Sequence, residues 1–385
     1  MRKAVKKALA YGLTFSLLAG CASEEDTIVM APVPVVESQF TPKAEWSSTI
    51  GDGVEYYFSK LKPAYGYDKV YLASRNGLVK ALNPETGKSV WSIDLETDVS
   101  ARLSGGITLS YGKAFIGSEN GELIALDAET GEVSWRSRVD GEILSSPLAD
   151  EGMVMVHSSR GVLMAFDADS GEERWQISSE VPNLTLRGDS TPVSTSGGVF
   201  WGMANGRLAA ALISKGQLLW QQPVGTPKGA TEIDRLVDVD ASPVVLGSRL
   251  FTLGYNGQLI AVELRTGQPA WKRNYSSATD FTTDSSRLFL VTDKDHLVAV
   301  DARSGTEVWK NTSLEHRLLS APTIIGNYLV TGDSEGYLYW IDRSTGAFVA
   351  QQQFDESGFA VSPIEVDGSF VVVTRDGLVK KMKIQ

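Results

Sequence analysis

GELIALDAETGEVSW, residues 121–135, is the stretch of sequence that recurs along the chain. The shared pattern is a glycine, an apolar run, a second glycine ten positions after the first and a tryptophan four positions later, and one copy has Asp295 in place of the first glycine. The six copies that keep the tryptophan are Gly77/Gly87/Trp91, Gly121/Gly131/Trp135, Gly161/Gly171/Trp175, Gly206/Gly216/Trp220, Gly257/Gly267/Trp271 and Asp295/Gly305/Trp309. A seventh copy, Gly336/Gly346, has Ala350 in the tryptophan position, and an eighth starts at Gly377. Repeats of this length are typical of solenoids and propellers, so they decide the fold.

The spacing within one copy predicts two adjacent β-strands. The run after the first glycine is apolar on both parities, as expected for a strand that is covered on both faces. Residues 127–131, DAETG, have the chemistry of a type I turn closed by a left-handed glycine. Trp135 then falls on the next strand, where its ring can fill the gap to a neighbouring sheet. Sheets that bury both faces against neighbours form a radial array, so the repeat predicts a β-propeller.

The number of copies predicts how the ring closes. Eight glycine-headed strands are present, but only seven are followed by an outer strand. Trp46 precedes the first copy, and no glycine-headed strand comes before it to form its blade. We therefore expect the segment around Trp46 to supply the outer strand of the blade that begins near Val361, which leaves no open sheet edge. The alternative is an unpaired N-terminal tail. The fold class predicted for residues 41–385 is all-β, an eight-bladed propeller of four-stranded antiparallel blades.

The N-terminal residues differ from this body. Residues 1–20 carry four positive side chains before an apolar stretch, which is the layout of a secretory signal peptide. The tetrapeptide at residues 18–21, LAGC, resembles the lipobox of bacterial lipoproteins, which implies that Cys21 is lipidated and becomes the first residue of the mature chain. The alternative is an ordinary signal peptide with a coincidental cysteine. Residues 21–40 are predicted to be a lipidated N-terminus and a flexible tether. Ala22 takes the place of the Asp that favours retention at the inner membrane, so an outer-membrane anchor facing the periplasm is expected.

The charge argues against nucleic acid as a partner. The chain has a formal net charge of -11, and loss of residues 1–20, with four positive and no negative side chains, leaves -15. A body of this charge is repelled by phosphate backbones, and no basic cluster offsets the repulsion.

Uneven repeat spacing predicts a binding site. The intervals between successive second glycines are 44, 40, 45, 51, 38 and 41 residues, and additional residues follow Trp175 and Trp220. Both insertions connect the outer strand of one blade to the inner strand of the next, so two long loops should lie side by side on one face. The predicted partner-binding residues are Leu184, Leu186, Arg187, Asp238 and Asp240. In the alternative interpretation the leucines lie beneath the loop and Arg187 pairs with an aspartate of this chain.

The sequence offers no catalytic constellation. The three histidines fall on different repeats without the spacing of metal ligands, so no metal site is predicted. Ser334 lies in a formal G-x-S-x-G match, but no helix follows, as a nucleophile elbow would require. We predict no catalytic residue, no metal ligand and no cofactor.

Two family resemblances follow from these motifs. The repeat A-L-D-A-x-T-G-x-x-x-W resembles the blades of pyrroloquinoline-quinone (PQQ) dehydrogenases, which supports the architecture more than the activity. Those enzymes carry a vicinal cysteine pair over the quinone, whereas this chain has a single cysteine. A quinoprotein-like dehydrogenase and a generic periplasmic ligand-binding propeller are therefore kept as alternatives.

A more specific resemblance covers nearly the whole chain. The lipobox, the acidic tether, the eight repeats, residues 184–188 (LTLRG), residues 231–240 (TEIDRLVDVD) and residues 332–340 (GDSEGYLYW) together look like the BamB family. The resemblance implies a non-enzymatic scaffold of the outer-membrane β-barrel assembly machinery. It implies docking on the periplasmic POTRA domains of the BamA subunit, association with the other Bam lipoproteins through BamA, and help in delivering unfolded outer-membrane proteins. The family uses the two loops for this contact. Pairing of the outer strands with extended clients is a further hypothesis.

Overall fold

The computed structural model describes residues 28–96 and 99–384. Within these ranges no helix has the length and apolarity needed to cross a membrane. The predicted signal peptide (residues 1–20) and Cys21 lie outside the described residues. Residues from Ala31 onward belong to the unit that contains the propeller.

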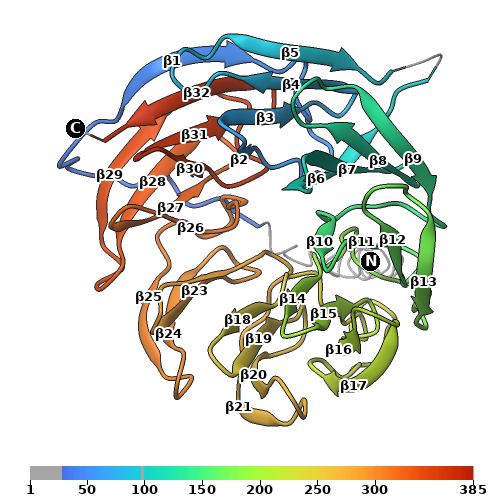
Figure 1. The fold of residues 1–385 in the computed structure, drawn as a ribbon. Helices are drawn as coiled ribbons and strands as arrows, with labels where there is room; N and C mark the ends of the chain where they lie inside the picture. Colours follow the sequence, from blue (N-terminus) through green and yellow to red (C-terminus); the bar gives the residue numbers. More distant parts are fainter. Residues whose placement is uncertain (1–27, 97–98, 385) are drawn as a thin grey trace, which may run out of the picture. The chain divides into compact units, whose positions relative to one another are not determined.

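Eight antiparallel sheets of four strands each form the blades of a ring (Figure 1). In each sheet the inner strand lies near the axis and the outermost strand lies on the rim, and every inner strand except β6 is only two or three residues long. Blade 1 contains β2 (Ala64–Gly66), β3 (Lys69–Ala73), β4 (Leu78–Leu82) and β5 (Ser89–Asp94). Blade 2 contains β6 (Leu103–Ser110), β7 (Lys113–Ser118), β8 (Glu122–Asp127) and β9 (Val133–Arg138). Blade 3 contains β10 (Leu148–Asp150), β11 (Met153–His157), β12 (Val162–Asp167) and β13 (Glu173–Ser178).

The remaining blades repeat this order. Blade 4 contains β14 (Val193–Thr195), β15 (Gly198–Met203), β16 (Arg207–Leu212) and β17 (Gln217–Pro223). Blade 5 contains β18 (Val244–Leu246), β19 (Arg249–Leu253), β20 (Leu259–Glu263) and β21 (Pro269–Arg273). Blade 6 contains β22 (Thr282–Thr283), β23 (Arg287–Val291), β24 (Leu297–Asp301) and β25 (Glu307–Asn311). Blade 7 contains β26 (Thr323–Ile325), β27 (Tyr328–Gly332), β28 (Tyr337–Asp342) and β29 (Phe348–Gln353).

Blade 8 joins the two ends of the propeller, as the sequence predicts. It contains β30 (Ile364–Val366), β31 (Ser369–Val373), β32 (Leu378–Lys383) and, as its outermost strand, β1 (Lys43–Thr49). β1 pairs with β32 in antiparallel register, with Trp46 opposite Lys381. The predicted eight-bladed ring and its closure around Trp46 are therefore confirmed.

The repeated tryptophan and glycine join neighbouring blades. The Trp135 ring lies on the turn of the next blade, where a Cβ added to Gly171 would be 2.6 Å from the ring. Its indole N–H donates to the Ala168 carbonyl of the same turn at 3.1 Å. The same hydrogen bond joins Trp46 to Pro84, Trp91 to Ala128, Trp175 to Ile213, Trp220 to Leu264, Trp271 to Ala302 and Trp309 to Arg343. The second glycine of each repeat is thus required for two reasons: the turn needs a positive φ, and the indole leaves no room for a side chain.

The missing tryptophan of the seventh repeat has a structural reason. In blade 8 the two outer strands come from distant parts of the chain, so no hairpin turn exists there to receive an indole ring. Ala350 instead lies opposite Trp340 across the two strands, whereas Trp135 of blade 2 lies opposite Ala125. The large and small residues have exchanged strands, which conserves the volume of the pair.

Phe40 completes the packing at this place. Its ring centroid lies 5.0 Å from that of Tyr328 and 5.9 Å from that of Trp340. The backbone N–H of Gln39 donates to the Val349 carbonyl of β29 at 2.8 Å. Further along, the N–H of Ala31 donates to the Glu315 carbonyl at 2.9 Å. Within the segment that the sequence assigns to a tether, residues 38–40 therefore lie against blade 7, and Ala31 contacts the connection between blades 6 and 7.

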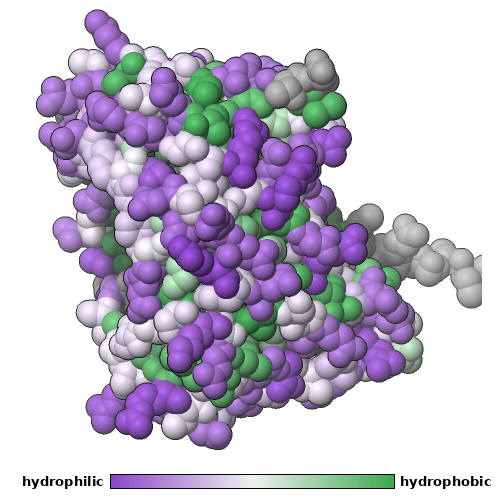
Figure 2. Space-filling model, turned by 45° about the vertical axis from the view of Figure 1, so that its right-hand side comes forward, coloured by the Kyte–Doolittle hydropathy of each residue, from purple (hydrophilic) through white to green (hydrophobic). Residues whose placement is uncertain are grey.

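Separate apolar clusters fill the spaces between blades. One cluster, for example, joins Phe115 and Leu123 of blade 2 to Val154 and Phe166 of blade 3. On the face shown in Figure 2, hydrophilic residues cover most of the surface and hydrophobic residues form smaller patches between them. Function is therefore to be sought in the loops that the ring holds in place.

Candidate functional site

Two long loops connect blade 3 to blade 4 and blade 4 to blade 5. The first loop is residues 179–192, between β13 and β14, and the second loop is residues 224–243, between β17 and β18. The Leu186 N–H of the first loop donates to Asp238 Oδ2 of the second at 3.0 Å, and Ser190 Oγ donates to the Ala241 carbonyl at 3.3 Å. The structure thus places the loops side by side, as the repeat spacing predicts.

The first loop presents an apolar and a cationic side chain to solvent. Leu184 is exposed, and Leu186 is half-buried at the edge of a cavity of about 720 Å³ in the middle of the ring. The Arg187 side chain is 49 % exposed. The alternative in which both leucines lie beneath the loop is therefore wrong for Leu184.

Arg187 is held in place by carboxylates of blade 2 and of the connection to blade 3. Its guanidinium lies 3.0 Å from Glu142 and 3.4 Å from Glu119. Glu119 is buried and also binds Arg75 at 2.7 Å. The partners are glutamates, not the aspartate that the sequence suggested as an alternative. Because a solvent-exposed ion pair such as Arg187–Glu142 contributes little to stability, its main effect is to orient the guanidinium.

Asp238 and Asp240 belong to the second loop, but both are buried. Their exposed fractions are 1 % and 5 %. The Asp238 carboxylate accepts hydrogen bonds from the Leu186 N–H at 3.0 Å and the Val239 N–H at 2.9 Å. These two aspartates cannot form the outer surface of a binding site in this conformation, so any effect on a partner would pass through the position of the first loop.

Asp189 completes a buried carboxyl cluster with these two residues. Burial raises the pKa of Asp189 well above its ordinary value, and the charge of Asp240 raises it further. Burial likewise raises the pKa of Asp238, again with a contribution from Asp240. Burial also raises the pKa of Asp240, and the Lys60 ammonium opposes this effect. The cluster therefore binds protons more readily than free aspartates do, because like charges in a desolvated space repel one another.

The arrangement does not match a metal or catalytic centre. Within residues 28–96 and 99–384 no group of three His, Cys, Asp or Glu side chains is placed to hold a metal ion. Ser334 lies in the connection between β27 and β28, and its Oγ donates to the Arg317 carbonyl in the connection between β25 and β26. This contact assigns Ser334 to loop structure.

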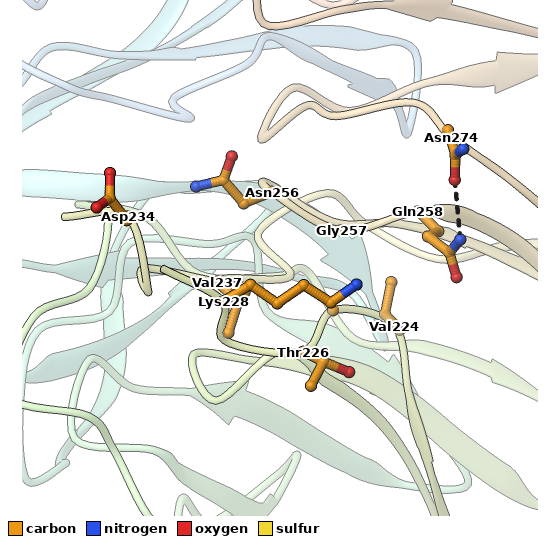
Figure 3. A pocket seen from close by; sticks show the side chains of 10 residues that line it. Val224, Thr226, Lys228, Asp234, Val237, Asn256, Gly257, Gln258 and Asn274 are labelled. Atoms are coloured by element: carbon orange, nitrogen blue, oxygen red, sulfur yellow. Dashed lines mark hydrogen bonds between the residues drawn. The ribbon is translucent and has the colours of Figure 1, made fainter. Parts of the chain in front are cut away.

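The second loop forms a smaller pocket with blade 5. The pocket has a volume of about 310 Å³, and Lys228 and Thr226 of the loop face Asn256, Gln258 and Asn274 across it (Figure 3). Gln258 Nε2 donates to Asn274 Oδ1 at 3.0 Å. Asp234 turns the loop here, since its carboxylate accepts from the Thr231 N–H at 3.1 Å. Ile233, in the same turn, is exposed.

A third connection on the same face was not singled out from the sequence. Residues 50–63 join the outer strand β1 to the inner strand β2, as the two loops join their own blades. Tyr56 is 79 % exposed and stacks on Tyr57, with ring centroids 4.6 Å apart. Arg75 lies beneath Tyr57, with its guanidinium carbon 3.8 Å from the ring centroid. Three consecutive aromatic residues, 56–58, in a strand connection were the available signal.

Comparison with known proteins gives a consistent family. A sequence-family model described as "Outer membrane protein assembly factor BamB" matches residues 75–311 and 293–385. The protein of that name from Aliivibrio fischeri is 74 % identical over 385 residues and covers 100 % of both chains.

Solved structures agree with this family. The crystal structure of BamB from Moraxella catarrhalis superposes with a TM-score of 0.80 at 27 % identity, covering 89 % of this chain and 100 % of that one. A quinohemoprotein alcohol dehydrogenase from Comamonas testosteroni gives a TM-score of 0.70 at 15 % identity, covering 89 % of this chain and 76 % of that one, which shows a shared fold alone. On the full-length identity and the family match, this chain belongs to the BamB family of outer membrane protein assembly factors.

Proposed function

We propose that this chain is a lipid-anchored scaffold of the outer-membrane protein assembly complex, and that it docks on the POTRA domains of BamA through the two loops. The family is one of assembly factors and not of enzymes. The observation that carries the proposed contact is the pairing of exposed Leu184 and Arg187 above buried Asp238 and Asp240. Aromatic and arginine side chains, surrounded by residues that exclude water, are the usual centres of such contacts.

The two kinds of residue have different roles in this proposal. Leu184 and Arg187 contact the partner, and Leu186 lies at the edge of the contact. Asp238 holds the Leu186 amide from below, and Asp240 fills the space beside Gly188, where an added Cβ would be 2.7 Å from Asp240 Oδ2. Substitution of either aspartate should therefore weaken binding without removing any contact to the partner.

The test is a titration of the full-length protein with the BamA periplasmic domains. Arg187→Ala should weaken binding at least about tenfold, as expected for a central arginine of an interface. Arg174→Ala is the matched control, because Arg174 in β13 is 51 % exposed and ion-paired with Asp167 of β12 rather than with a residue of either loop. Equal binding by the wild type and Arg187→Ala would remove the assignment of the contact. The same assay with unrelated periplasmic proteins checks specificity.

We propose that the chain is anchored through Cys21 in the outer membrane, facing the periplasm. The support is the lipobox at residues 18–21 together with the family. Cys21→Ser should move the protein from the membrane fraction to the soluble periplasmic fraction. Retention of the variant in the membrane would contradict the lipid anchor.

A further inference from the structure

One lysine reaches across the central cavity from the connection between β1 and β2. The segment that carries it dips inward, so that Ser59 and Leu61 are buried and Lys60 and Lys62 line the cavity. The cavity is also lined by Ser146, Thr191, Ser242 and Ser362, which open inner strands of four different blades. The backbone of Lys60 therefore follows the strand that closes the ring, and its side chain ends among the loops of other blades.

The backbone of Lys60 is fixed to blade 2. Its N–H donates to the Ser104 carbonyl at 3.0 Å, and the residue forms a parallel bridge with Gly105. A Cβ added to Gly106 would lie 2.5 Å from the Lys60 carbonyl oxygen, so the close approach requires glycine. The base of the side chain is thus a rigid support.

The Lys60 ammonium contacts three consecutive inter-blade connections. Its Nζ donates to the Asp189 carbonyl of the first loop at 3.2 Å and to the Asp240 carbonyl of the second loop at 3.2 Å. The third acceptor is Asp280 Oδ1, at 3.4 Å, in the connection between blades 5 and 6. An ammonium has three N–H groups, so each one has an acceptor. The two carbonyls belong to the residues directly beneath the proposed partner surface.

The same ammonium also acts on the buried carboxyl cluster, because its charge opposes the rise in the pKa of Asp189 and Asp240. Asp189, Asp238 and Asp240 approach one another in a desolvated space, where unopposed negative charges repel. Asp280 is held ionised: burial opposes this, but the Lys60 charge and the hydrogen bonds from Ser242 lower its pKa. Loss of the ammonium would remove three hydrogen bonds and the charge that offsets the cluster.

We infer that Lys60 is a positioning residue that fixes the first and second loops in the arrangement that binds the partner. The inference rests on the proposed function and names a residue that does not touch the partner itself. It explains how two loops from separate blades keep one relative position although each is long. Lys60 belongs to a third inter-blade connection, and its ammonium binds a backbone carbonyl of each loop.

The test compares Lys60→Met with Lys62→Met in the full-length protein. Methionine keeps the length of the apolar stem and removes the charge. Lys62 is the matched control, because it lines the same cavity, is exposed and takes part in no salt bridge within the described part of the chain. Lys60→Met should weaken binding to the BamA periplasmic domains by about tenfold, whereas Lys62→Met should bind like the wild type. Lys60→Arg, which keeps the charge and its donors, should recover part of the loss.

Hydrogen exchange separates positioning from general instability. In Lys60→Met, the amides of residues 184–190 and 238–241 should exchange about tenfold faster, while those of β15 and β16 should be unchanged. Unchanged exchange in both loops, or an equal loss of binding in Lys62→Met, would overturn the inference. If Arg187→Ala keeps full affinity, the proposed function fails instead, and the exchange data still decide whether Lys60 holds the loops.

Discussion

Trp46→Ala tests the closure of the ring, on which the position of every loop depends. β1 is held in blade 8 by its hydrogen bonds with β32 and by the Glu45–Lys381 salt bridge at 3.3 Å, and no hairpin turn joins the two strands, because they are not consecutive in the chain. Every other outer strand is joined to its neighbour by a short hairpin turn. Trp46 adds the contact to blade 1, with its ring over Gly87 and its indole N–H bonded to the Pro84 carbonyl at 2.8 Å.

The cost of the substitution follows from these contacts. Removal of a buried tryptophan side chain costs about 3 to 5 kcal/mol through lost burial and the cavity that remains. The Pro84 carbonyl loses one donor, but Lys381 Nζ still donates to it at 3.0 Å, so no large desolvation term is added. We expect the free energy of unfolding to fall by about 4 kcal/mol.

The control is Trp135→Ala, and the measurement is equilibrium unfolding in guanidinium followed by circular dichroism. Trp135 has matching contacts, with Gly171 beneath its ring and the Ala168 carbonyl as acceptor, but its strand follows a hairpin. Both variants should lose similar stability in this unfolding assay. Hydrogen exchange of the backbone amides then distinguishes them, because only in Trp46→Ala can β1 detach alone, so that the amides of β1 and β32 exchange faster than in the wild type. A loss below about 1 kcal/mol for Trp46→Ala, or identical exchange patterns, would refute the reasoning.

Two other predictions concern single residues of the scaffold. Burial lowers the pKa of His157 from its ordinary 6.5 to about 4. The neutral buried imidazole therefore contributes its full stability above pH 6.5, and this contribution is lost as the pH falls to about 4. The loss in the free energy of unfolding is about 3 kcal/mol. His157→Gln should therefore flatten the fall in Tm over this range, whereas an unchanged pH profile would contradict it; the raised pKa of nearby Asp189 acts in the opposite direction in both proteins. Gly171→Ala should lower the free energy of unfolding by more than about 2 kcal/mol, because a Cβ there would meet the Trp135 ring. Gly152→Ala, with a similar positive φ and no atom near the new Cβ, should cost only about 1 kcal/mol; equal losses in thermal unfolding would show that backbone strain alone matters.

The repeat made the ring predictable from sequence because each of its parts has one physical task. The second glycine, the tryptophan and the apolar run serve a turn, an inter-blade contact and a doubly covered strand, and all three tasks recur in blades 1 to 6. The count of strands then required Trp46 to close the ring, and β1 does pair with β32. Even the departure at Ala350 follows the same logic, since the blade next to it has no turn to receive a tryptophan.

The burial of the loop aspartates was not anticipated. Residues 236–241, LVDVDA, lie in a long insertion, and the sequence predicts that Asp238 and Asp240 bind a partner directly. The structure buries Val237, Asp238, Val239 and Asp240 together. The alternation of apolar and acidic residues predicts burial of Val237 and Val239, which are two positions apart, but it would place the aspartates on the opposite, exposed face. What alternation could not reveal is the cation opposite, since Lys60 lies about 180 residues away in the sequence.

The loops differ from ordinary surface connections in how their position is fixed. A flexible loop must be ordered when a partner binds, and the conformational entropy lost at that step reduces the affinity. Here Asp238 holds the first loop from below, Glu142 holds Arg187 from the side, and Lys60 holds the backbone of both loops from across the cavity. Ordering has therefore taken place largely during folding. It follows that substitutions in these supports should shorten the lifetime of the proposed complex, because a loosened backbone no longer holds the side chains that we propose contact the partner.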